Sequence, residues 1–179
     1  LSTRNGDLAK VLASRLARRL VEVPQWRFLP TPQDGSHPLY EIDTAGHVAR
    51  LYFHEGQLRA WDSDKRIILV QAGTQGGKTS FLPWWMAREV LTTGGGDHLA
   101  VRVSYDLFKL KLLPEMLEVF EHILGIGRYW AGDQVIELRD PQTGKFLAER
   151  ASDKMWGRVI LRSATAKGGL ESATAKSAA

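Results

Sequence analysis

The chain has 179 residues, of which 44% are hydrophobic and 25% are charged, with a formal net charge of +4 and no cysteine. This length and composition are typical of one globular domain, and they exclude a disulfide framework and a thiolate metal site. No apolar run approaches the ~20 residues that a membrane-spanning helix needs, and no signal peptide is recognisable. The small positive charge allows a nucleic-acid partner without requiring one.

Residues 1–46 are predicted to form a helical and irregular lead-in segment. Apolar residues at helical spacing predict a helix over residues 6–21. Arg15, Arg18 and Arg19 lie in this helix, and we interpret them as a solvated face rather than as a DNA contact. The rest of the segment holds several prolines and is interpreted as an irregular connector.

The next part of the chain is predicted to hold three strands and a helix. Short strands are expected at Leu39–Ile42 and His47–Phe53, where apolar and polar residues alternate. A helix is expected over Glu55–Asp62. The apolar run Ile67–Val70 is interpreted as a buried strand that leads directly into a glycine-rich turn. We place a second domain, a partial P-loop ATPase domain, over residues 47–179.

The glycine-rich turn has the layout of a phosphate-binding P-loop. It reads Gln71-Ala-Gly-Thr-Gln-Gly-Gly-Lys-Thr79 and opens a predicted helix over residues 77–91. Glycines let the backbone N–H groups turn toward phosphate oxygens, and the start of the helix adds its positive dipole. Lys78 is expected to reach the β- and γ-phosphates, and the Thr79 hydroxyl to bind Mg²⁺. The predicted nucleotide-binding residues of the loop are Gly73, Thr74, Gln75, Gly76, Gly77, Lys78 and Thr79.

One position of the loop departs from the strict pattern, because Ala72 stands where that pattern has glycine. Alanine adopts a positive φ less readily than glycine does. The alternative interpretation is a strand–turn–helix corner whose glycines only make a tight turn. The order of strand, turn, Gly-Lys-Thr and helix favours the phosphate-binding interpretation.

The remainder of the chain is predicted to continue the alternation of strands and helices. The expected elements are a strand at Leu99–Val103, a helix from Asp106 to Gly125 bent at Pro114, a hairpin around Asp140–Gly144 with strands Gln134–Leu138 and Phe146–Arg150, and a strand at Val159–Arg162. This order predicts an α/β fold with a parallel central sheet flanked by helices and an inserted β-hairpin.

A P-loop hydrolase also needs an acidic motif, in which an apolar strand ends in an aspartate that holds Mg²⁺ and a glutamate polarises water. No run fits. Val135–Asp140 and Leu39–Asp43 carry a charge inside the run, and Val159–Leu161 ends in Arg162. Either the chain is a piece of a longer protein that ends before this strand, or it is not a hydrolase; the two ends of the sequence favour the first. No catalytic residue is therefore assigned.

Four segments in their order resemble the N-terminal ATPase domain of the large terminase subunit of tailed bacteriophages. They are Glu55-Gly-Gln-Leu-Arg-Ala-Trp61, Gln71–Thr79, Ser104-Tyr-Asp-Leu-Phe108, and Val159–Ala164 with Gly168–Ser172. The resemblance covers about residues 50–176. It implies a RecA-like P-loop NTPase fold that is incomplete here, ATP and Mg²⁺ as cofactors, and ATP hydrolysis coupled to translocation of double-stranded DNA.

The resemblance also implies partners and further site residues. It implies a homo-oligomeric ring that works with the portal and the small terminase subunit in the cytoplasm of a bacterial host, and a nuclease domain further along the protein. Gln57 matches a glutamine that contacts adenine in the family; a helix-start residue without a ligand is the alternative. Many terminases carry an arginine in the loop where this chain has Thr74, so Arg162 or a neighbouring subunit is expected to supply that charge.

Two other functions stay open. The first is a non-catalytic DNA-binding or assembly module with a degenerate P-loop, which the positive charge and the early arginines favour. The second is a piece of another P-loop ATPase, such as a helicase. The tryptophans are interpreted as core residues more readily than as base-stacking platforms.

Overall fold

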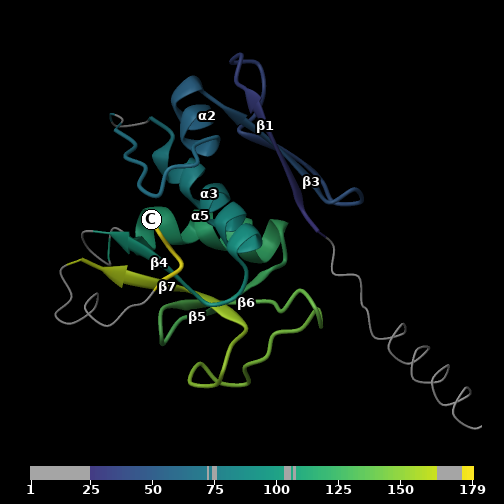
Figure 1. The fold of residues 1–179 in the computed structure, drawn as a ribbon, viewed down its shortest axis with the longest axis vertical. Helices are drawn as coiled ribbons and strands as arrows, with labels where there is room; N and C mark the ends of the chain where they lie inside the picture. Colours follow the sequence, from purple (N-terminus) through teal and green to yellow (C-terminus); the bar gives the residue numbers. More distant parts are fainter. Residues whose placement is uncertain (1–24, 72, 74–75, 103–105, 107, 165–174) are drawn as a thin grey trace, which may run out of the picture.

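The computed structural model describes residues 25–71, 73, 76–102, 106, 108–164 and 175–179 (Figure 1). The predicted helix over residues 6–21, with its three arginines, lies outside this part of the chain, as do Thr74 and Gln75. The described residues form two sheets with helices between and beside them, so the α/β class is confirmed. None of the described helices has the length and apolar character needed to cross a membrane.

A small sheet of three strands begins the described chain. Its strands are β1 (Arg27–Pro32), β2 (Tyr40–Asp43) and β3 (Val48–Phe53), in the order β1-β3-β2. The predictions for β2 and β3 are confirmed to within one residue. The prolines of this segment predict an irregular connector, and that prediction is wrong for β1. β1 is an edge strand, which tolerates proline because one row of its N–H groups needs no partner. Both β1 and β2 pair with β3, so the expected domain boundary at residue 46 falls inside this sheet.

The larger sheet is mixed rather than parallel. Its strands are β4 (Asp97–Arg102), β5 (Gly127–Trp130), β6 (Val135–Leu138), β7 (Gly157–Ser163) and β8 (Ser177–Ala178), in the order β5-β6-β7-β4-β8. β4 runs parallel to β7 and β8, whereas β6 runs antiparallel to β5 and β7. The strands predicted for β4 and β7 are confirmed, and the prediction of a parallel sheet holds only for β7, β4 and β8.

The inserted hairpin is present, but it is displaced from its predicted position. It joins β5 to β6, and the turn lies at residues 131–134. The predicted turn at Asp140–Gly144 closes with a single bridge between Asp140 and Lys145. Residues 146–150 form no strand, so the prediction of a second hairpin strand there is wrong. The chain does turn at Asp140–Gly144, as predicted, but β6 pairs with β5 and β7 instead of with the residues that follow this turn.

Three helical segments cover the larger sheet or join it to the smaller one. They are α2 (Glu55–Trp61), α3 (Lys78–Thr93), and a continuous stretch made of η1 (Phe108–Leu112), α5 (Leu113–Leu117) and η2 (Glu118–Ile123). The predictions for α2 and α3 are confirmed. Pro114 lies in the first turn of α5, and wide π-helical turns flank α5 on both sides, which is how the stretch accommodates the proline.

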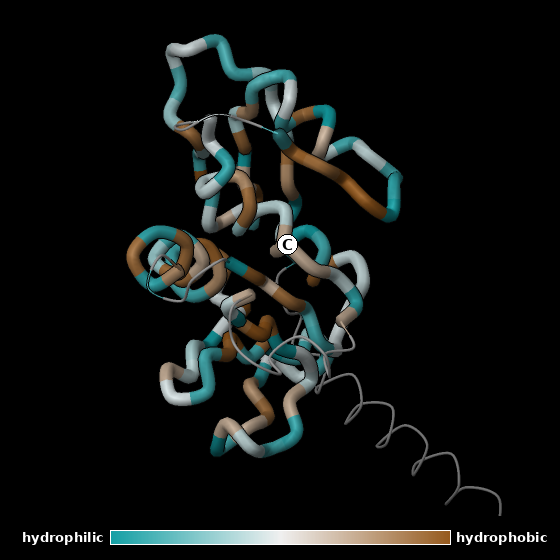
Figure 2. Tube along the Cα trace, turned by 90° about the vertical axis from the view of Figure 1, so that its left-hand side faces the viewer, coloured by the Kyte–Doolittle hydropathy of each residue, from teal (hydrophilic) through white to brown (hydrophobic). Residues whose placement is uncertain are grey.

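The helix α3 lies at the centre of the molecule, between the two sheets (Figure 1). Aromatic rings of the small sheet pack on it: Phe28 and Tyr40 lie 6.1 and 5.2 Å from Trp84, measured between ring centroids. Trp61 and Trp84 are buried, which confirms the core interpretation for these two tryptophans. Figure 2 shows that hydrophobic stretches follow the strands and helices in contact, whereas several outer loops are hydrophilic.

The buried strand predicted at Ile67–Val70 does not form, and this prediction is wrong. The segment is irregular chain that belongs to neither sheet, and Ile67 and Leu69 are 84% and 86% exposed. The physical reason lies at the edge of the sheet. β4 pairs with β7 on one side and with β8 on the other, so no edge of β4 remains for this segment.

Candidate phosphate-binding site

The predicted loop ends at the first turn of α3. Gly77 caps this helix with a φ of +68°, in the left-handed region that glycine adopts at little cost. A Cβ atom at Gly77 would lie 2.8 Å from Nε2 of Gln57, so both the backbone conformation and the space require glycine. Lys78 and Thr79 are the first two helical residues, which places them beside the N–H groups and the positive dipole at the start of α3.

Two hydrogen-bond donors of the loop converge on one oxygen atom. Nζ of Lys78 donates to the carbonyl oxygen of Gly73 at 2.8 Å, and the backbone N–H of Gly76 donates to the same oxygen at 3.2 Å. A carbonyl oxygen carries partial negative charge and accepts the donors that a phosphate oxygen accepts. The structure therefore brings together three of the predicted residues in an arrangement of donors that suits an anionic oxygen.

A cavity of about 300 Å³ lies beside the loop. Its lining residues are Gln57, Ala60, Ile68, Val70, Gly76, Lys78, Thr79, Phe81, Leu82, Trp85, Arg102, Ala178 and Ala179. Lys78, Thr79 and Arg102 supply positive charge and a hydroxyl, whereas most of the other lining side chains are apolar. Of the predicted residues, Gln57, Gly76, Lys78 and Thr79 line the cavity, and Gly73 and Gly77 belong to the loop but not to the lining.

Arg102 and Trp85 also line the cavity, and the sequence motifs did not predict either of them as a site residue. Arg102 is the last residue of β4, and ligands of open α/β sheets bind beyond the carboxyl ends of the strands, so this rule could have found it. Trp85 follows Lys78 by seven residues, which is two helical turns and the same face of α3. Arg162, the predicted source of charge, donates instead to the carbonyl oxygen of Asp133 at 3.4 Å and does not line the cavity.

The first turn of α2 contacts the loop through two side chains. His54 caps α2, and its Nδ1 accepts the backbone N–H groups of Gly56 and Gln57 at 3.1 and 3.3 Å. Gln57 completes a capping box with His54, because its Oε1 accepts the backbone N–H of His54 at 3.1 Å. The other end of the same amide, Nε2, donates to the carbonyl oxygen of Gly77 at 3.1 Å. Gln57 therefore lies at the site, as predicted, with both ends of its amide bonded to the protein.

The charges of the site suit a triphosphate better than they suit a metal centre. Lys78 and Arg102 supply two cations, and the Thr79 hydroxyl supplies one oxygen ligand for Mg²⁺. None of the described lining residues is an aspartate or a glutamate. Within the described chain, no group of three or more histidine, aspartate and glutamate side chains could hold a metal ion.

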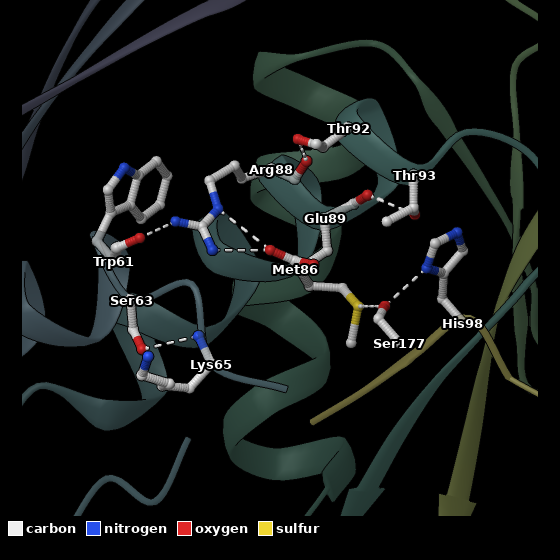
Figure 3. Close-up of polar contacts among 10 residues, drawn as sticks. All are labelled: Trp61, Ser63, Lys65, Met86, Arg88, Glu89, Thr92, Thr93, His98 and Ser177. Atoms are coloured by element: carbon white, nitrogen blue, oxygen red, sulfur yellow. Dashed lines mark hydrogen bonds and ion pairs between the residues drawn. The ribbon is translucent and has the colours of Figure 1, made fainter. Parts of the chain in front are cut away.

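A second set of polar contacts fixes the wall of the cavity that β8 forms (Figure 3). Nδ1 of the fully buried His98 lies 2.7 Å from Oγ of Ser177, and its Nε2 lies 3.2 Å from the carbonyl oxygen of Gly94. Burial lowers the pKa of His98, and the positive charge of Lys176 lowers it further, although the Gly94 carbonyl opposes this shift. These contacts hold Ser177 on β4, and the next two residues line the cavity.

An arginine joins α3 to α2 on the same side (Figure 3). The guanidinium of Arg88 lies 4.8 Å from the ring centroid of Trp61, donates to the carbonyl oxygen of that residue, and pairs with Glu89 at 2.7 Å. This contact keeps the end of α2 against α3. The two helices that carry Gln57 and Lys78 are therefore fixed to each other at both ends of α2.

No family of known proteins, no curated protein and no solved structure matches this chain. The function of the site is therefore argued from its own geometry and from the order of its sequence segments.

Proposed function

We propose that the loop from Gly73 to Thr79 and the adjoining cavity bind the phosphates of a nucleoside triphosphate. The observation that carries the proposal is the convergence of the Lys78 ammonium and the Gly76 N–H on one oxygen, at the start of a 16-residue helix. Both donors and the helix dipole favour negative charge at the same place, and a second cation, Arg102, lines the adjoining cavity.

The apolar part of the cavity supports a nucleotide over a free phosphate ion. Leu82 and Trp85 line it together with Ile68. A volume of about 300 Å³ lies at the lower end of the range for small-molecule sites, which are mostly apolar with a few placed polar groups. We propose that the base lies against this apolar wall, and the resemblance of the sequence makes ATP the expected nucleotide, with Mg²⁺ held by Thr79.

We propose further that the chain is the ATP-binding part of a terminase-like DNA-packaging motor. Support comes from the resemblance and from the contact between two of its segments: the segment Glu55–Trp61 contacts the end of the loop through Gln57 and Gly77. In this proposal the protein acts on double-stranded DNA as a ring, with the portal and the small terminase subunit as partners, in a bacterial host.

A second candidate function is nucleotide binding without turnover, within a DNA-binding or assembly module. The observation that favours it is the lack of a carboxylate among the described residues of the cavity, since hydrolysis needs one to activate water. Both candidates predict nucleotide binding by this chain, and neither predicts phosphate release by the chain alone, because no acidic motif is found in its sequence. In the first candidate a longer protein that contains this chain releases phosphate from ATP·Mg²⁺, and in the second it does not.

The test is ATP binding by the Lys78→Met variant, measured by calorimetry. A charge-assisted hydrogen bond contributes ~1.5–3 kcal/mol, so we expect the affinity to fall by roughly ten- to a hundredfold. Lys65→Met is the control, because Lys65 is an exposed lysine that pairs with Asp64 and does not line this cavity. Equal affinities of the wild-type and Lys78→Met chains would contradict the proposal. Phosphate release by this chain would rule out the second candidate.

A further inference from the structure

We infer that Gln57 is a positioning residue that holds the end of the phosphate loop, and that it does not read the nucleotide base. The inference rests on the proposed function, since it takes the loop as the part that binds phosphate. Through the Gly77 carbonyl, Gln57 fixes the orientation of the peptide unit whose N–H belongs to Lys78, at the start of α3.

The first step concerns the amide of Gln57, which is 7% exposed and bonded at both ends. Its oxygen accepts the N–H of His54 at 3.1 Å, and its nitrogen donates to the carbonyl of Gly77 at 3.1 Å. The neighbours fix this orientation, because the reverse orientation would set an NH₂ group against an N–H and an oxygen against a carbonyl. Pairing with an adenine edge needs a donor and an acceptor together; here each end of the amide already has a protein partner, and the residue is 7% exposed, so an adenine edge would have to displace these contacts.

The second step concerns the carbonyl groups at the end of the loop. The Gly77 carbonyl accepts both Nε2 of Gln57 and the N–H of Phe81, the latter at 3.0 Å, so one oxygen joins α2 to α3. The Gly76 carbonyl lies 3.4 Å from Nε2 of His54. Because Nδ1 of His54 accepts two backbone N–H groups, the proton of the ring belongs on Nε2, which makes it the donor to Gly76.

The third step follows from the geometry of the peptide bond. In a trans peptide the C=O and N–H groups point in opposite directions. Two consecutive carbonyls, those of Gly76 and Gly77, are turned toward His54 and Gln57. The N–H groups of Gly77 and Lys78, which belong to the same two peptide units, are therefore turned away from them. Gln57 thus directs the N–H of Lys78 to the opposite side, and His54 does the same for the N–H of Gly77; both donors suit a phosphate oxygen there.

The role as a positioning residue predicts an effect that is independent of the base. Replacing Gln57 by methionine keeps the length of the side chain and removes both hydrogen bonds. We expect the affinities for ATP, GTP and inorganic tripolyphosphate to fall by the same factor, roughly tenfold, because all three bind through phosphate. A loss confined to ATP would make Gln57 an adenine contact, and unchanged affinity for all three would leave it without a role; either result overturns the inference. Lys65→Met again serves as the control.

Hydrogen exchange of the backbone amides tests the same contact without a ligand. In the Gln57→Met variant we expect the amide of Phe81, which is bonded to the Gly77 carbonyl, to exchange faster, whereas Gly94, at the other end of α3 and bonded to Val90, keeps its rate. If the variant does not fold, Gln57→Glu replaces it, because glutamate keeps the cap of α2 and sets a carboxylate oxygen, in place of the donor, against the Gly77 carbonyl. Unchanged exchange at the start of α3 overturns the inference. If the wild-type chain binds none of the three ligands, the proposed function fails. Hydrogen exchange then still shows whether Gln57 holds the start of α3 through the Gly77 carbonyl.

Discussion

The two sides of the phosphate loop differ in how they are held. On the side that leaves the loop, Gly77 is bonded to both Gln57 and Phe81, and Lys78 begins a long helix. On the side that enters it, Ile67 and Leu69 are 84% and 86% exposed, and their segment belongs to neither sheet. The loop is therefore built from its helix side.

This difference has a physical cause. A helix start is completed mainly by groups close in sequence, because the carbonyls at its start accept N–H groups of the next turn, as Gly77 accepts that of Phe81. Gln57 adds one contact from 20 residues away. A strand is completed by its neighbours, and the neighbour that β4 accepts is β8, which comes from the end of the described chain. The comparison teaches that this strand–turn–helix sequence specifies its helix side mainly through local contacts and its strand side only through distant pairing.

The largest expected effect is a difference in the free energy of unfolding between alanine substitutions at two glycines, Gly77 and Gly73, which lie on opposite sides of the loop. In Gly77→Ala, the methyl group must adopt a positive φ and approach Gln57, and we expect the free energy of unfolding to fall by roughly 2 kcal/mol. In Gly73→Ala, the new Cβ meets no described atom within 4 Å, and we expect a change below about 0.5 kcal/mol. Urea unfolding measures both values. Similar losses at the two positions would contradict the idea that only the helix side is held.

The next effect concerns β8, which occupies the edge of β4. Burial lowers the pKa of His98 in the folded chain, whereas the unfolded chain has the usual value near 6.5. Above about pH 6.5 the imidazole is neutral in both states and its contribution is complete. Below that pH the unfolded chain takes up a proton first, so stability falls by up to about 1.4 kcal/mol per pH unit until the folded pKa is reached.

The pH dependence is measured by urea unfolding between pH 7.5 and 5 for the wild-type chain and for His98→Gln. We expect the variant to lose this part of the slope. The charged groups around the ring are Lys176, Glu89 and Asp97, and the variant leaves all three in place. If the free energy of unfolding changes with pH in the same way in both proteins, neutral His98 does not contribute to holding β8.

Local patterns predicted the elements whose stability is local. The helix over Glu55–Trp61 has its capping residues within its own first turn, and α3 has its apolar face and its glycine cap. The elements that the sequence did not reveal depend on distant partners: β1 pairs with β3 despite its prolines, and β8 is a strand of two residues held by β4. Two residues are too short for the alternation of apolar and polar side chains that predicts a strand.

The site shows the same division between residues that sequence patterns indicate and residues that only the fold brings together. The loop glycines and Lys78 were proposed because a motif spaces them in sequence, and Gln57 was proposed from the family resemblance; the structure brings Gln57 to the loop. Arg102 and Trp85 were not found, because a lining residue is defined by the cavity rather than by its neighbours in sequence. The direction of the Gln57 amide also lay beyond the sequence, since it depends on which groups of His54 and Gly77 face it.

The smallest expected effect lies on the strand side of the loop. Leu69 is 86% exposed, so Leu69→Ser removes little buried surface, and we expect the free energy of unfolding to change by less than about 0.5 kcal/mol. Val159→Ser in β7 is the matched control, because Val159 is fully buried in the larger sheet and the same kind of substitution there should cost several times more. Urea unfolding compares the two. A large loss at Leu69 would mean that Ile67–Val70 is buried in solution as a strand, as its sequence predicts, and that both sides of the loop are held.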